Sequence, residues 1–140
     1  MEGGFCLPAG RKLEDSNLID MIKSFRDLEV YQESYSLMLI IHKTIISFPT
    51  FERHDLVSQM RRASKSCPSN IAEGWAKRRF EKEFKKHLDC AIGSANEMEV
   101  HLETARDLNY LSAELANKLI NRYQKLGGKL TNLRNNWKTF

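Results

Sequence analysis

The sequence is poor in residues that interrupt regular structure or cross-link a chain. It holds 3 proline, 7 glycine and 3 cysteine residues among 140. So little proline and glycine argues against collagen-like, mucin-like and wholly disordered chains. Three cysteines are too few, and odd in number, for a secreted disulfide scaffold, so a reducing cytoplasm is the expected location. The longest apolar run, residues 37–41, is far shorter than the roughly 20 residues that a membrane span needs, and no signal peptide is predicted.

The charges are distributed in blocks, although the net charge is only +4. Residues 53–86 carry 10 basic and 4 acidic side chains, residues 87–110 carry 1 and 5, and residues 111–140 carry 6 and 1. Such blocks are typical of a polyanion-binding surface, or of charge matching between neighbouring helices or subunits. Both interpretations stay open at this point.

The length predicts one domain that can bury a core without disulfides or metals. Residues 1–10 show no apolar periodicity and hold three of the seven glycines, and the periodic region begins after Met21. We therefore predict a disordered or non-native tail over residues 1–22 and a folded domain over residues 23–140.

Apolar residues recur at steps of three and four along most of this domain, which predicts helices. The expected helices cover residues 25–48, 52–79 and 80–108, and a fourth follows Ser112 as its N-cap. Four amphipathic helices with short connections predict an all-α, antiparallel, up-down-up-down four-helix bundle. Pro68 lies inside the second helix and predicts a kink there, because an interior proline removes a backbone hydrogen bond.

Motifs for catalysis or metal binding are missing. A ferritin-like di-iron site needs a glutamate three residues before a histidine, and none of the four histidines has one. His87 and Cys90 have a spacing that suits a shared metal ion, but a surface histidine beside a core cysteine is the preferred interpretation. No phosphate-binding glycine loop or nucleophile motif is present. The sequence therefore predicts a protein that is not an enzyme and has no cofactor or metal.

Polar residues also lie on or beside the apolar stripes. Inside a bundle such groups need hydrogen-bond partners and can fix the register of the helices. A ligand pocket is one interpretation, and a polar network in the core is the one we favour. The four residues are Gln59, Asn70, Ser94 and Glu97.

The basic segment around the second and third helices is the strongest functional signal. Clustered lysine and arginine neutralise phosphates and release counterions, which is the sequence-independent part of nucleic-acid binding. A merely solvated helix face is the alternative, and the local charge excess makes the two about equally favoured. The candidate contacts are Arg61, Arg62, Lys65, Lys77, Arg78, Arg79, Lys82, Lys85 and Lys86.

Opposite charges are also expected to meet elsewhere in the bundle. The acidic part of the third helix lies beside the basic fourth helix in an antiparallel arrangement. These charges either join the two helices within one chain or lie at a head-to-tail contact between subunits. The residues concerned are Glu97, Glu99, Glu103, Lys118, Arg122 and Lys125.

Several short segments match a known pattern together. They are residues 25–32, Phe48-Pro49 followed by Glu52, Gln59-Met-Arg-Arg-Ala63, Ser66-Cys-Pro-Ser-Asn-Ile-Ala-Glu-Gly74, and Gly93-Ser94 followed by Glu97. In these segments the chain resembles the bacterial four-helix bundle family encoded in 23S rRNA intervening sequences, often labelled a ribosomal protein. The resemblance covers about residues 23–126, and the Asn-Ile-Ala-Glu-Gly run is its most distinctive part.

The resemblance implies an antiparallel four-helix bundle that assembles into a homo-oligomeric ring, a pentamer. Relatives of the family include accessory proteins of diversity-generating retroelements, which bind nucleic acid and a reverse transcriptase. Carried over, this points to Arg61, Arg62, Lys65, Lys77, Arg78 and Arg79 as nucleic-acid contacts. The expected partners are further copies of the chain, nucleic acid (structured RNA foremost), and a reverse transcriptase or other protein, with no membrane. The alternative is a protein-interaction scaffold whose charge blocks serve ring assembly and partner binding.

Overall fold

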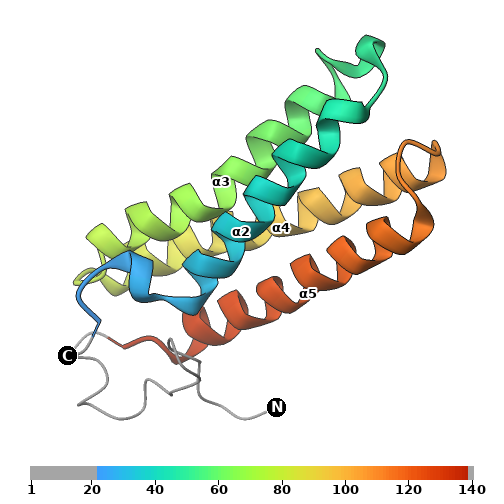
Figure 1. Ribbon diagram of the computed structural model, residues 1–140. Coiled ribbons are helices and arrows are strands. Elements are labelled where there is room, and N and C mark those ends of the chain that lie inside the picture. Colours follow the sequence, from blue (N-terminus) through green and yellow to red (C-terminus); the bar gives the residue numbers. More distant parts are fainter. Residues whose placement is uncertain (1–21, 139–140) are drawn as a thin grey trace.

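The computed structural model describes residues 22–138, and all regular structure in that range is helical. The predicted all-α, four-helix fold is confirmed (Figure 1). The predicted tail over residues 1–22 lies outside the described residues apart from Ile22, which packs against the core. The long helices are α2 (Glu29–Thr44), α3 (Leu56–Ala76), α4 (Glu81–Asp107) and α5 (Ala113–Asn136), and short 3-10 turns cover Phe25–Asp27, Ile45–Ser47 and Thr50–Glu52.

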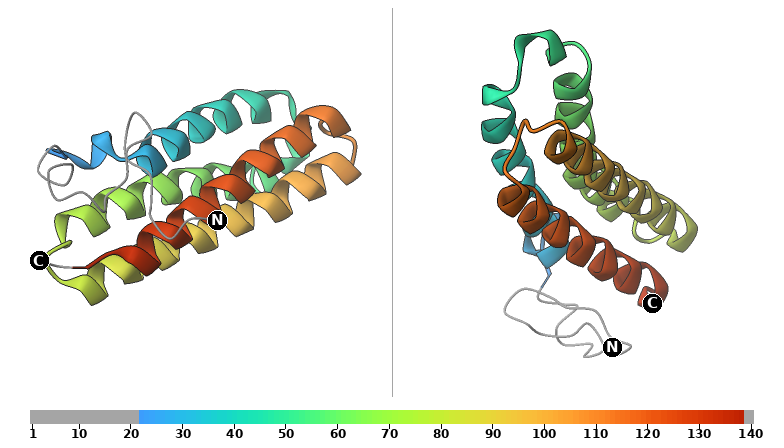
Figure 2. Two further views of the ribbon diagram at one scale, coloured as in Figure 1. Left: turned by 90° about the horizontal axis from the view of Figure 1, so that it is seen from below. Right: turned by 90° about the vertical axis from the view of Figure 1, so that its right-hand side faces the viewer.

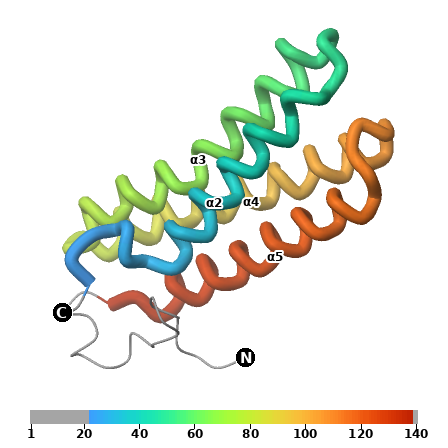
Figure 3. The backbone as a smooth tube through the Cα atoms, in the orientation of Figure 1, coloured from blue at the N-terminus to red at the C-terminus, as the bar shows by residue number. Residues whose placement is uncertain are grey.

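Neighbouring helices run in opposite directions. Across α3 and α4, Arg62 meets Glu97 and Asn70 meets His87, so the residue numbers rise on one helix as they fall on the other. Figures 1 and 2 show each helix returning alongside the one before it. Figure 3 shows that the start of α2, the end of α3, the start of α4 and the end of α5 lie together. We call this the turn end, because it holds the α3–α4 turn, and the opposite end the loop end.

The core is built from one apolar stripe per helix. Residues three and four apart share a helix face, so the three-and-four spacing of the sequence brings these side chains inside together. Polar and charged residues occupy most of the remaining positions. Fully buried members include Leu37 and Ile41 of α2, Met60, Cys67 and Ile71 of α3, Leu88 and Met98 of α4, and Tyr123 and Leu126 of α5.

Two helices begin later than predicted. The Phe25–Asp27 turn precedes α2 and is closed by a capping box between Ser24 and Asp27, so the helix itself starts at Glu29. The Thr50–Glu52 turn likewise precedes α3, which starts at Leu56. In both places local hydrogen bonds close a tighter turn before the α-helical pattern begins.

Helix α3 also ends earlier than predicted, at Ala76. The backbone N–H of Lys77 donates to the carbonyl of Gly74 at 3.0 Å, and Phe80 has the extended backbone angles φ −104° and ψ 98°. The basic residues 77–79 therefore lie in the α3–α4 turn and not in the last turn of a helix. Helix α3 is continuous through Pro68, and the kink stays a prediction.

A close approach and an aromatic cluster fix the turn end. A Cβ atom placed on Gly74 would lie 2.8 Å from His87 Cβ, so α3 and α4 are too close here for a larger residue. Next to it the Trp75, Phe84 and Trp137 rings pack edge to face, with centroids 4.7–6.2 Å apart. The α3–α4 turn therefore rests on a tightly packed base.

The length and hydropathy of the helices decide whether one of them could cross a membrane. Between residues 22 and 138 no helix combines the length and the apolar character that crossing a bilayer requires.

Candidate functional site

The nine predicted cationic contacts do not form one surface. Eight of them fall into two groups, and the ninth, Arg62, pairs with Glu97 of α4. Arg61 and Lys65 of α3 line hollows that lie against α2. The six residues that we call the turn cluster surround the α3–α4 turn. Lys65 and Lys77 are separated by about 18 Å along the axis, at 1.5 Å per residue. The turn cluster consists of Lys77, Arg78, Arg79, Lys82, Lys85 and Lys86.

The turn cluster combines cations with aromatic rings. The Arg78 guanidinium lies 4.3 Å from the centroid of the Trp75 ring and donates a hydrogen bond of 3.0 Å to the Trp75 carbonyl. The Arg79 guanidinium lies 4.8 Å from the centroid of Phe80, whose side chain is 55% exposed. Trp75 is buried and supports the Arg78 guanidinium from the protein side, whereas Phe80 is exposed to water.

The predicted contacts differ in whether an anionic side chain already neutralises them. Arg62 is paired with Glu97, and Lys85 with Glu81 at 2.8 Å. Within residues 22–138, no ion pair is formed by Arg61, Lys65, Lys82 or Lys86. All four are exposed, so their charges are available to an external anion.

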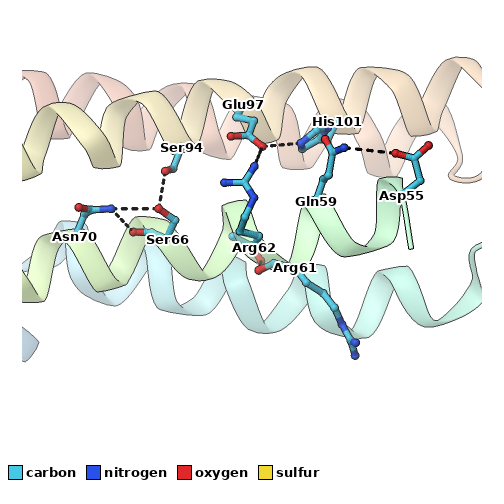
Figure 4. A network of polar contacts seen from close by, with 10 residues as sticks. Asp55, Gln59, Arg61, Arg62, Ser66, Asn70, Ser94, Glu97 and His101 are labelled. Atoms are coloured by element: carbon cyan, nitrogen blue, oxygen red, sulfur yellow. Dashed lines mark hydrogen bonds and ion pairs between the residues drawn. The ribbon is translucent and has the colours of Figure 1, made fainter. Parts of the chain in front are cut away.

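A chain of hydrogen bonds runs from the turn cluster along the α3–α4 interface. Lys77 Nζ lies 3.3 Å from His87 Nε2, and His87 Nδ1 lies 3.2 Å from Asn70 Oδ1 and 3.7 Å from Glu73 Oε2. Asn70 Nδ2 donates to the hydroxyl of Ser66 at 3.1 Å, and Ser94 Oγ donates to the same hydroxyl at 2.9 Å (Figure 4). The chain links the turn cluster to the middle of the interface.

The structure divides the four residues of the predicted core polar network among different places. Asn70 and Ser94 belong to the hydrogen-bonded chain, which lies at the rim of the helix interface. Gln59 is exposed and reaches only Asp55, at 3.4 Å. Glu97 belongs to a separate cluster, in which its Oε2 atom accepts from Arg62 and from His101 Nε2 (Figure 4).

Sequence reasoning missed Ser66 and His101 as members of these clusters, and it considered His87 only as a metal ligand beside Cys90. Ser66 lies four residues from Asn70, and His101 four residues from Glu97, on the same helix face. That spacing was the available signal.

The six residues of the predicted α4–α5 charge contacts do not pair with one another within the chain. Glu97 is paired with Arg62 of α3, and Arg122 with Glu33 of α2 at 2.9 Å. Helix α4 is joined to α5 through Asp89 and Arg134 instead. The positions of Glu97 and Arg122 on their helices turn them away from the α4–α5 interface. Of the part of the chain that is described, Glu99, Glu103, Lys118 and Lys125 enter no ion pair.

The burial of His87 and Cys90 differs from the predicted one. Cys90 is exposed and His87 is half-buried, the reverse of the predicted surface histidine and core cysteine. Cys67 is the core cysteine, and its burial raises the pKa of the thiol to about 12. Over residues 22–138 no three His, Cys, Asp or Glu side chains are grouped so that they could hold a metal ion.

At the loop end, a hydrogen bond joins the connection between α2 and α3 to the connection between α4 and α5. The hydroxyl of Tyr110 donates to Glu52 Oε2 at 2.9 Å, and Glu52 is buried. Burial raises the pKa of the Tyr110 hydroxyl, and its hydrogen bond to Glu52 adds to the increase. Nothing in the sequence around Glu52 indicates its burial, and both of its chain neighbours, Phe51 and Arg53, are exposed.

Two hollows on the face between α2 and α3 were not predicted. One has a volume of about 280 Å³, with Tyr31, Tyr35 and Met38 on its α2 side and Lys65 and Pro68 on its α3 side. The other has a volume of about 220 Å³ and lies nearer the loop end, beside Ile46, Arg53 and Arg61. Tyr35, at the border of the larger hollow, is 43% exposed.

Comparisons with known proteins find one family model and a solved structure that are similar to this chain. The model of a family described as 23S rRNA-intervening sequence protein matches residues 26–132. A solved structure from Bacteroides thetaiotaomicron, described as a protein of unknown function from the S23 ribosomal protein family, has 22% sequence identity and a TM-score of 0.66. The match covers 76% of this chain and 95% of that one, and at this identity it shows the fold alone. No curated protein matches the chain.

Proposed function

Because this chain belongs to the 23S rRNA-intervening sequence protein family, we propose that it is a non-enzymatic, homo-oligomeric bundle of the cytoplasm that binds structured RNA or other nucleic acid. The observation that carries the proposal is that four of the predicted contacts, Arg61, Lys65, Lys82 and Lys86, are exposed and form no ion pair within residues 22–138. Each such cation releases a counterion when it neutralises a phosphate, and this release drives binding without reading sequence.

The arrangement of the turn cluster supports this proposal. Its cations follow one another around a short turn that the Trp75, Phe84 and Trp137 rings hold in place. Little ordering entropy is lost when such a preorganised surface meets a phosphate backbone. Phe80 and the Arg79 guanidinium offer flat faces beside the charges, as RNA-binding surfaces commonly do.

Self-association is supported by exposed apolar side chains. Ile46 is 79% exposed, Phe51 76% and Leu108 51%, and all three lie at the loop end. Large apolar side chains that are left in water commonly mark protein contacts. The family resemblance suggests a ring of five copies, in which Glu99 and Glu103 of one copy would face Lys118 and Lys125 of the next.

The test is a salt titration of the binding of a labelled, structured 23S rRNA fragment. A triple variant of the turn cluster, Arg79→Gln, Lys82→Gln and Lys86→Gln, is compared with Lys23→Gln, Lys43→Gln and Lys138→Gln, which removes the same charge at exposed positions outside α3, α4 and the proposed subunit contact. We expect the turn variant to flatten the slope of log K against log salt by about 2 to 3, since each phosphate contact contributes roughly 0.7–0.9. Equal losses in both variants would contradict a defined surface.

A protein-interaction scaffold is the second candidate, and the unpaired charges of α4 and α5 favour it. In that case Glu99→Lys with Glu103→Lys changes the mass of the oligomer in light scattering. The wild-type protein then also fails to bind the RNA at low salt. Tight, salt-dependent RNA binding by the wild type would exclude the scaffold as the sole function.

A further inference from the structure

The face between α2 and α3 has an aromatic wall. The Phe25 and Tyr31 rings meet edge to face with centroids 4.8 Å apart, and Tyr31 and Tyr35 stack at 5.8 Å with planes 25° apart. This run of three rings borders the larger hollow, and its last member, Tyr35, is 43% exposed. An exposed ring at the end of a stack can accept a further flat group.

The opposite wall of the same face is cationic. Lys65 lines the larger hollow, while Arg53 and Arg61 line the smaller one. None of these three cations forms an ion pair within residues 22–138. Figure 4 shows Arg61 pointing away from the network around Glu97, on the side of α3 opposite Arg62.

No acidic side chain interrupts this face where it is hollowed. None of the described residues that line the two hollows is an aspartate or a glutamate. Arg26 adds a cation at one end, with its guanidinium 4.4 Å from the centroid of the Phe25 ring. We call the two hollows and the residues that line them the α2–α3 seam.

We propose that the α2–α3 seam binds unpaired nucleotides of RNA, with bases stacked on Tyr35 and phosphates held by Arg53, Arg61 and Lys65. This inference rests on the proposed function and names the part of the RNA that is recognised. Grooves that bind single strands combine a cationic track for the backbone with aromatic rings for the bases. A duplex keeps its bases inside, so it could use the cations but not the rings.

The experiment compares two labelled RNAs of equal length, a short oligouridine and a fully paired duplex, by fluorescence anisotropy. Tyr35→Leu keeps an apolar side chain but removes the ring, and Tyr35→Phe keeps the ring as the matched control. Tyr35 is largely exposed and outside the core, so both variants should fold, which thermal melting checks. We expect Tyr35→Leu to weaken oligouridine binding by about 5- to 150-fold, the range for loss of one base–aromatic stack. Tyr35→Phe, and the affinity of either variant for the duplex, should match the wild type.

Photocrosslinking then locates the bound strand. With 5-iodouridine in the oligonucleotide, crosslinked peptides should contain Tyr31 or Tyr35. Crosslinks at Phe80, together with wild-type affinity of Tyr35→Leu, would overturn the seam but leave RNA binding through the turn cluster intact. A change of oligomer mass in Tyr35→Leu without a change in RNA affinity would also overturn it, because the seam would then be a contact between copies. Failure of the wild type to bind either RNA would overturn the proposed function as well.

Discussion

Gly74 shows how one residue sets the distance between two helices. A Cβ atom there would lie 2.8 Å from His87 Cβ and 3.1 Å from Phe84 Cδ1, and neither atom is at the flexible end of a side chain. Gly74→Ala must therefore separate α3 from α4, which we expect to lower the free energy of unfolding by about 1–3 kcal/mol.

Gly93 provides the matched control on the facing helix. Among residues 22–138, no atom outside the adjoining turns of α4 lies within 4 Å of a Cβ atom at this position. Gly93→Ala should therefore raise the free energy of unfolding by about 0.4–1 kcal/mol, because alanine loses less conformational entropy in a helix. Urea unfolding measures both variants, and equal effects of the two would contradict the close approach.

Cys67 predicts a loss of stability at alkaline pH. Burial raises the pKa of its thiol from an ordinary value of 9.0 to about 12. Above pH 9 the unfolded chain therefore releases a proton that the folded protein retains, so this contribution is full below pH 9 and declines up to about pH 12. In urea unfolding, the advantage of the wild type over Cys67→Ala should shrink between pH 8 and pH 10.5. An advantage that stays constant with pH would show that the thiol is not protected.

At the residue scale, the sequence predicted what depends on near neighbours in the chain. The Ser112 cap was correct, because a cap depends on the next few residues alone. The fates of Gln59 and Asn70 could not be told apart, since both lie beside an apolar stripe. Only the position of α4 decides that Asn70 meets His87 while Gln59 faces water.

At the scale of the element, α5 begins at a defined cap. The Ser112 hydroxyl accepts a hydrogen bond of 3.1 Å from the backbone N–H of Leu115. Ser112→Ala leaves that N–H without its partner and should cost about 0.5–2 kcal/mol of unfolding free energy, whereas Ser112→Asp should retain the cap. Thermal melting of the two variants checks this, and identical losses would rule out a capping role.

Helices were predicted well because apolar periodicity records which face is buried. It does not record which neighbour covers the other faces. For that reason the nine cations, all in one stretch of sequence, are divided between the α2–α3 face, the α3–α4 turn and, for Arg62, the α3–α4 interface. The ion pairs of Arg62 and Arg122 were out of reach for the same reason, because their partners lie on helices that are 35 and 89 residues away along the chain.

At the scale of the whole molecule, the four helices are not held equally. Helix α4 packs along both α3 and α5, whereas α2 packs along α3 and has a smaller contact with α5, which includes the pairs Glu29–Lys129 and Glu33–Arg122. Segments with less packing open at lower free energy. In hydrogen exchange, we expect amides in the middle of α4 to exchange most slowly and those of α2 to exchange first among the long helices. Equal protection of α2 and α4 would indicate a single unfolding unit.

The two ends of the described chain lie at the same end of the bundle, which allows a circular permutant. Trp137 packs on Trp75, and Phe25 lies beside Pro68 and Ala72, so the segments before α2 and after α5 both lie at the turn end. A short linker could join Lys138 to Ile22, and the chain could be cut at the exposed residues between Arg53 and Asp55. Such a circular permutant would keep all four helices and the Glu52–Tyr110 hydrogen bond. The permutant should therefore fold to the same bundle with its helices in a different order along the chain, because their packing does not depend on which helix comes first.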